Sequence, residues 1–149
     1  MVQNLYICIM KLIWNYLIPA YFTELDGNIL IDGDALPIYD GEAPPDVQGS
    51  YILLGDRTST QTQAKGKFTS ECTLLVDVVI KGPNFGFKDS EDAAEQIMQL
   101  INSDNNPICA SSFQVVTTSI QSTNNLNGLN PTDNIFRTLI RFRHLVNQI

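Results

Sequence analysis

His144 is the one histidine of the 149-residue chain, and it is therefore the side chain best suited to acid–base chemistry near neutral pH. A nucleophilic mechanism would also need a serine, cysteine or threonine held beside this base. The sequence contains no GxSxG, HExxH, GxGxxG or GxxxxGKS/T motif that would supply such a nucleophile, a metal site or a phosphate loop. We therefore expect His144 to be a satisfied or half-buried histidine, and the protein not to be an enzyme.

Carboxylates offer two other kinds of chemistry. Asp26, Asp32 and Asp34 lie close enough in sequence to suggest a calcium loop, but Leu30 occupies a position that needs an oxygen ligand, and no glutamate follows at the required spacing. We interpret this segment as a solvated turn and expect neither a metal nor a cofactor. A hydrolase with an Asp or Glu pair that meets only in space stays open as a remote alternative, because such a pair leaves no sequence signature.

The three cysteines, Cys8, Cys72 and Cys109, are odd in number, far apart and without CxxC spacing. This pattern argues against a disulfide framework or a zinc site. We expect buried thiols in a reducing compartment.

Charge is distributed unevenly along the chain. The formal net charge of −7 argues against a general nucleic-acid-binding protein, which would need clustered Lys and Arg. Residues 24–56 contain eight carboxylates and no basic residue, whereas three of the nine basic residues lie near the other end, at Arg137, Arg141 and Arg143. Such polarity suits self-association through oppositely charged surfaces, and charge balance within one fold is the equal alternative.

Three interpretations of the three arginines stay open: a solvated strand face, an ion-pair surface between subunits, or contact with DNA in the lumen of a ring. The residues we select as interface candidates are charged side chains of the acidic segment, of the polar segment 57–67 and of the last expected strand. They are Arg57, Lys65, Lys67, Asp32, Asp34, Arg137, Arg141 and Arg143.

The N-terminal segment predicts a helix over residues 3–17 that ends before Pro19, because proline disfavours helical geometry in the residue that precedes it. Residues 5–18 are strongly apolar but too short to span a bilayer, and Lys11 lies inside the stretch rather than ahead of it, unlike a signal peptide. We therefore expect a helix with an apolar surface almost all round, covered by a sheet on one side. A membrane anchor is a minor alternative.

Turn signals at Asp26-Gly27 and Asp32-Gly33 flank a short apolar run at residues 29–31 and predict a hairpin. Residues 50–54 predict a short buried strand that stops at Gly55. Residues 57–67 are polar and aperiodic, which favours an exposed loop or an arm that orders on a partner.

The second half of the chain gives the clearest periodicity. Residues 68–80 alternate between apolar and polar side chains, as a half-buried strand does. A helix should then begin near Asp89 or Ser90 and end before residues 104–107. Strands are expected over residues 108–118 and 135–146, with an Asn-rich loop over 121–134 between them. The whole chain, residues 1–149, thus predicts one α+β domain, with a mainly antiparallel sheet and two helices packed on it.

The order of these features resembles the tail-completion proteins of tailed bacteriophages, also described as tail-terminator, neck or head–tail connector proteins. The resemblance covers residues 38–146. It rests on GSYILLGD (49–56), the polar segment after it (57–67), TLLVDVVI (73–80), EDAAEQI (91–97) and TDNIFRTLIRFR (132–143).

Membership of that family would imply a virion structural protein that forms a ring at the head–tail junction. The implied partners are further copies of the chain and adjacent connector, portal or tail-tube proteins, with possible non-specific contact with DNA in the lumen and no membrane. The implied location is the virion neck or tail, with the host cytoplasm during assembly. The family supplies no catalytic residues. A cytosolic, non-catalytic binding or accessory module with a similar fold is the alternative.

Overall fold

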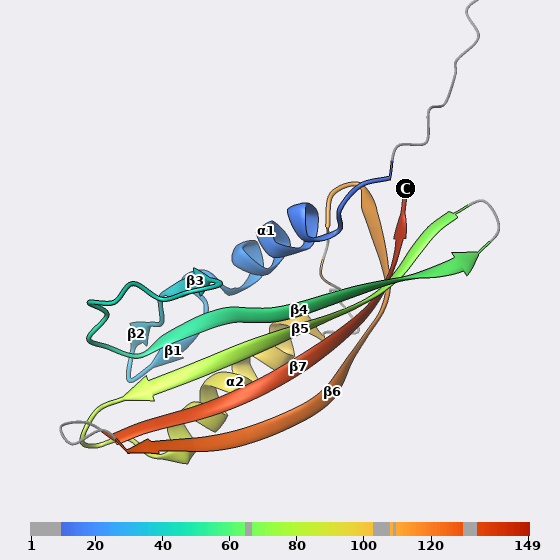
Figure 1. Ribbon diagram of the computed structural model, residues 1–149. Coiled ribbons are helices and arrows are strands. Elements are labelled where there is room, and N and C mark those ends of the chain that lie inside the picture. Colours follow the sequence, from blue (N-terminus) through green and yellow to red (C-terminus); the bar gives the residue numbers. More distant parts are fainter. Residues whose placement is uncertain (1–9, 65–66, 103–107, 109, 130–133) are drawn as a thin grey trace, which may run out of the picture.

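The computed structural model describes residues 10–64, 67–102, 108, 110–129 and 134–149, and it confirms the α+β class (Figure 1). Two helices pack against a five-stranded sheet, and a small hairpin lies beside them. In chain order the elements are α1 (Trp14–Leu25), β1 (Leu30–Ile31), β2 (Asp34–Ala35), β3 (Ile38–Asp40), β4 (Tyr51–Ala64), β5 (Lys67–Lys81), α2 (Phe87–Ile101), β6 (Phe113–Leu129) and β7 (Asn134–Gln148).

The large sheet has the strand order β3-β4-β5-β7-β6. Only the short β3 runs parallel to its neighbour, and every other pair is antiparallel. At the centre, β5 pairs with β7 without a register shift, from Thr69 opposite Asn147 to Lys81 opposite Ile135. Bulges interrupt β4 near Gly55 and β6 at two places, and these irregularities accompany a strong twist (Figure 1).

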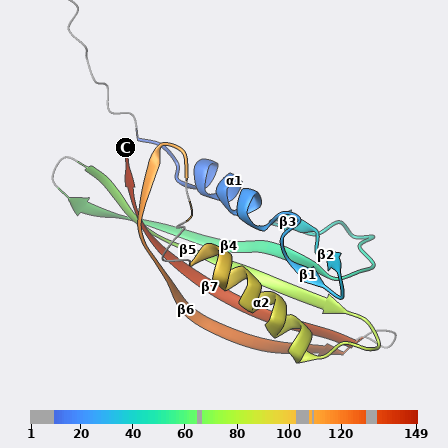
Figure 2. The same cartoon turned by 180° about the vertical axis from the view of Figure 1, so that it is seen from behind.

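The alternation predicted for β5 and β7 is confirmed. Their even-numbered side chains form a buried inner face, and both helices cover this face (Figure 2). The fully buried members of β5 and β7 on this face are Cys72, Leu74, Val76, Val78, Ile80, Ile140, Phe142, His144 and Val146. Burial also raises the pKa of the Cys72 thiol to about 11, so this cysteine behaves as a small apolar side chain. Cys8 and Cys109 lie outside the described residues.

The predicted boundaries of the first helix are wrong. The helix runs over Trp14–Leu25 and contains Pro19, and residues 3–9 of the predicted span lie outside the described residues. Leu17, Tyr21 and Leu25, spaced four apart, are fully buried against the inner face. The free energy from burying this row outweighs the cost of an interior proline, and Pro19 itself points to solvent.

The second helix is confirmed, although it begins at Phe87, slightly earlier than predicted. Asp89 lies in its first turn rather than at its cap, and its carboxylate accepts a hydrogen bond from the backbone N–H of Gly86 (2.9 Å). Ala94, Ile97 and Ile101 lie on one face of the helix and pack into the core. Gln96 joins the helix to the small hairpin, since its side-chain amide exchanges two hydrogen bonds with the backbone of Leu30 (2.9 Å each).

Two predicted loops are strands instead. The strand that was expected to stop at Gly55 continues as β4 to Ala64, so most of the segment 57–67 is paired with β5. The Asn-rich segment 121–134 belongs largely to β6, which pairs with β7 as far as Leu129 opposite Asn134. The polar side chains of both segments form no apolar stripe that would predict a strand. Their extended conformation is instead stabilised by backbone pairing with β5 and β7, whose alternation is well defined.

The hairpin predicted around Asp32-Gly33 is confirmed as the β1–β2 pair. Asp32 and Gly33 both have positive φ (51° and 83°), which is the conformation of a type I′ turn. A separate observation concerns membranes: in the described part of the chain, no helix combines the length and apolarity that a membrane crossing requires.

Replacing Pro19 with alanine should stabilise the protein. Alanine restores a backbone N–H inside α1 and removes the steric conflict of the proline ring, so we expect the free energy of unfolding to rise by about 1–3 kcal/mol. Urea denaturation followed by circular dichroism measures this change.

The matched control is Pro44→Ala, because Pro44 lies in an exposed segment outside the helices. There the substitution only increases the freedom of the unfolded chain and should leave stability equal or slightly lower. A loss of stability in Pro19→Ala would contradict our account of α1.

Candidate assembly surface

His144 is fully buried on the inner face of β7, beneath α1. Its Nε2 is hydrogen-bonded to the hydroxyl of Tyr21, and its Nδ1 lies 2.8 Å from the hydroxyl of Thr118 on β6. The imidazole also stacks on Phe142 and meets the Tyr21 ring edge-on. The histidine therefore links α1, β7 and β6. The prediction that its hydrogen bonds are satisfied is confirmed, and the residue is fully buried rather than half-buried.

One arrangement of protons satisfies every polar group of this trio. If Tyr21 donates to Nε2 of a neutral imidazole, Nδ1–H donates to Thr118 and the buried phenol hydrogen is satisfied as well. Burial lowers the pKa of His144 to about 4 and raises that of Tyr21 well above its ordinary value. A neutral imidazole enclosed in this way has no ring nitrogen left for a substrate, and its role is structural.

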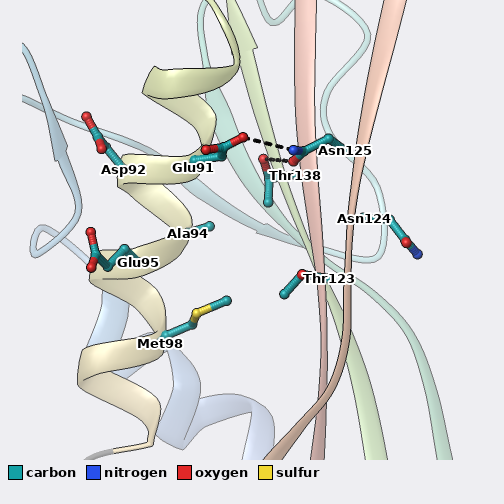
Figure 3. A pocket seen from close by; sticks show the side chains of 9 residues that line it. All are labelled: Glu91, Asp92, Ala94, Glu95, Met98, Thr123, Asn124, Asn125 and Thr138. Carbon is teal, nitrogen blue, oxygen red and sulfur yellow. Dashed lines mark hydrogen bonds between the residues drawn. The ribbon is translucent and has the colours of Figure 1, made fainter.

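A hollow of about 440 Å³ lies between α2 and the strands β6 and β7 (Figure 3). A chain of hydrogen bonds crosses it: Thr138 donates to the side-chain oxygen of Asn125 (2.8 Å), and the amide of Asn125 donates to Glu91 (2.9 Å). Asp92 and Glu95 also line the hollow, but Figure 3 shows their carboxylates directed away from β6. Among the described residues, no three His, Cys, Asp or Glu side chains come together, here or elsewhere, in a group that could hold a metal ion.

The face of the sheet opposite the helices has a different character, and we call it the helix-free face. It contains the odd-numbered side chains of β5 and β7 together with their neighbours in β4 and β6. Figure 1 shows α2 behind the central strands and Figure 2 shows it in front of them, and Tyr21 of α1 packs against Phe142 and His144 on the same inner face. Along its centre are Leu53, Leu75, Val79, Leu139 and Leu145, each buried or half-buried between longer side chains.

The structure places two of the three candidate arginines in ion pairs within the chain. Arg137 binds both carboxylate oxygens of Asp77, one of them through Nε at 3.2 Å, and Asp77 is nearly buried. Hydrogen bonding to this carboxylate raises the pKa of Arg137. Arg143 pairs with Glu71 (2.7 Å) at a more exposed position.

Arg141 lies between these two pairs, flanked on the sheet by Leu75 and Ser122. Within the described part of the chain it makes no ion pair, so it is the one arginine of β7 whose charge stays available to another molecule.

The other candidates do not gather with these arginines. Arg57 lies on the inner-face side of β4, where it pairs with Asp40 and stacks over Trp14. Asp32 and Asp34 are exposed in the β1–β2 hairpin. Lys67 begins β5, and Lys65 lies outside the described residues.

Sequence reasoning missed the partners Asp77 and Glu71. Their position on the polar face of β5 was visible in the alternation, but the register that places them near Arg137 and Arg143 was not.

The chain resembles a known protein in its three-dimensional structure. No family model and no curated protein matches the sequence. Among solved structures, a chain from the "Virion of native gene transfer agent (GTA) particle" superposes with a TM-score of 0.70 and 17% sequence identity. The match covers 93% of this chain and 99% of that one. At this identity the likeness shows that the two chains share a fold.

The burial of neutral His144 predicts a specific loss of stability in acid. The folded pKa of about 4 lies below the ordinary value of 6.5, so protonation favours the unfolded state. The stabilisation is complete above pH 6.5 and declines as pH falls towards 4, by about 3 kcal/mol at 1.4 kcal/mol per pKa unit.

Urea midpoints of the wild type and His144→Gln at pH 7, 5.5 and 4 test this. The carboxylates titrate in both proteins, so the difference between the two curves isolates the histidine. Parallel curves over this range would show that His144 does not titrate on unfolding.

Proposed function

We propose that this protein is a structural subunit of a tailed phage or phage-like virion, and that it forms a homo-oligomeric ring at the head–tail junction. The observation that carries the proposal is the fold shared with a chain of a gene-transfer-agent virion over nearly the full length of both. Its neighbours in the particle would be connector, portal or tail-tube proteins, and its location the virion neck or tail.

The surface chemistry is consistent with assembly. A sheet face with a half-buried apolar centre and the available cation Arg141 suits contact with a negatively charged protein surface. The chain itself offers such a surface, since Asp32 and Asp34 are exposed in a segment that contains eight carboxylates and no base. Fully enclosed His144 is the wrong kind of group for a catalytic base, which supports a non-enzymatic role.

The location can be tested directly in particles purified from the phage or phage-like element that encodes the protein. Quantitative mass spectrometry should find a fixed, low copy number per particle, and an antibody label should mark the head–tail junction in electron micrographs. Complete absence of the protein from intact particles would reject the proposal.

Charge reversal at Arg141 should separate assembly from folding. Arg141→Glu should change the free energy of unfolding by no more than about 0.5 kcal/mol, because it breaks no ion pair that the described chain contains. At low ionic strength, where surface charges are least screened, it should weaken oligomerisation by about tenfold. Light scattering across a concentration series gives the second quantity.

Arg137→Glu is the matched comparison on the same strand face. It places a second carboxylate beside nearly buried Asp77, so we expect a loss of folding stability on the order of 2–3 kcal/mol. If Arg141→Glu instead assembles like the wild type at low salt, the helix-free face is not an electrostatic contact surface.

A further inference from the structure

The five-stranded sheet leaves a long edge open on one side. β6 is the last strand in the order, and in the described part of the chain it pairs with β7 alone. Its 17 residues include no Lys, Arg, Asp, Glu or Pro. From Gln121 to Asn127 every side chain is exposed.

A second open edge lies on the opposite side of the sheet. β3 pairs only with Ile52–Leu54 of β4, so beyond the bulge near Gly55 β4 pairs with β5 and with no other described strand. Residues 58–64 also contain no charged residue and no proline, and Thr58 to Thr62 are all exposed. The sheet therefore ends on both sides in a polar strand segment that contains no charged residue, residues 121–127 of β6 on one side and residues 58–64 of β4 on the other.

Open edges present a row of backbone N–H and C=O groups that can pair with another strand. Soluble proteins usually protect such edges with charges, especially lysine, or with proline. Both edges here lack this protection over many residues, although bulges are present in each strand. This combination favours pairing with a further strand.

The directions of the strands identify the occupant. Successive antiparallel pairings from β4 through β5 and β7 to β6 make β4 and β6 run in opposite directions. A second copy placed beside the first in the same orientation would bring its β4 next to the first copy's β6 as an antiparallel pair. In this head-to-tail contact the β6 edge of each copy meets the β4 edge of the next, so the contact can be repeated from copy to copy. Repeated contacts of this kind form a ring when the rotations between successive copies add up to a full turn.

Charge near the two edges supports the same partner. The strand next to the β6 edge, β7, contains three arginines and no carboxylate. Of these three, Arg141 makes no ion pair within the described chain, while near the β4 edge Glu71 is paired with Arg143 and Arg57 with Asp40, which leaves exposed Asp56. A second copy of the chain thus presents the carboxylate of Asp56 on the side of the edge whose neighbour has the available cation Arg141.

We propose that copies of this chain join through these edges, with β6 of one subunit pairing antiparallel with residues 58–64 of β4 in the next. The ring then contains one continuous β-sheet. This inference rests on the proposed ring and names the contact that builds it.

Opposite charges placed directly across two strands stabilise their pairing, and like charges destabilise it. One variant, called the like-charge chain, combines Ser122→Lys and Asn124→Lys on β6 with Thr58→Lys and Thr60→Lys on β4. The other, the opposite-charge chain, keeps the β6 lysines and has Thr58→Glu and Thr60→Glu. All four positions are exposed in the single chain. Because Ser122 lies opposite Arg141 and Thr60 opposite Glu71 within the chain, the folding stability of each variant is measured beside its assembly.

The concentration at half-assembly, measured by analytical ultracentrifugation at low salt, is the readout. We expect about a tenfold or greater increase for the like-charge chain and a value within about threefold of the wild type for the opposite-charge chain. High salt should abolish the difference between them. Circular dichroism melts confirm folding, and Gln48→Lys with Gln99→Lys, exposed sites outside both strands, controls for added charge.

The outcomes separate the two proposals. If β6 paired with β6 of a second copy, both variants would be equally weakened, because both have the β6 lysines; that result overturns the head-to-tail contact. Two variants that both assemble like the wild type overturn it too, and leave the ring itself standing. A wild-type chain that stays monomeric at every concentration contradicts the ring, and the edge pairing with it.

Discussion

The unbroken pairing of β5 with β7 is the constraint on which the rest of the structure depends. Because side chains alternate strictly along both strands, this single register sends Leu74, Val76, Ile140 and Phe142 to one face. The same register places Asp77 within reach of Arg137 on the other. A shift by one residue would bury the arginines and expose the core, so the apolar face and the ion pairs select the same arrangement.

Because both helices cover the same face of the sheet, α1 packs over a polar group of that face as well as over apolar ones. The inner face is apolar except for a few polar groups, and His144 lies among them directly under the helix. Its bonds to Tyr21 and Thr118 satisfy a group that would otherwise be costly to bury. The row Leu17, Tyr21 and Leu25 then fixes where the helix lies, which explains why an interior proline is tolerated.

Sequence reasoning succeeded where one face of an element is apolar and the other is not. β5, β7 and α2 all show this contrast, and all three were predicted close to their observed positions. The outer parts of β4 and β6 have Thr, Ser, Asn and Gln on both sides, so they lack any period and look like loops. Pairings such as Arg143 with Glu71 were unpredictable for another reason: they depend on the register between strands far apart in sequence.

The polar character that hid these two strands from prediction also bears on how the proposed ring would form. An edge of Thr and Asn side chains gains little hydrophobic free energy on pairing, so one contact between two subunits is weak. In a closed ring each subunit makes two such contacts, and the closing contact forms within an existing assembly at high effective concentration. In the proposed ring, weak polar edges would thus keep free subunits apart and make the complete ring, rather than an open chain of subunits, the stable product.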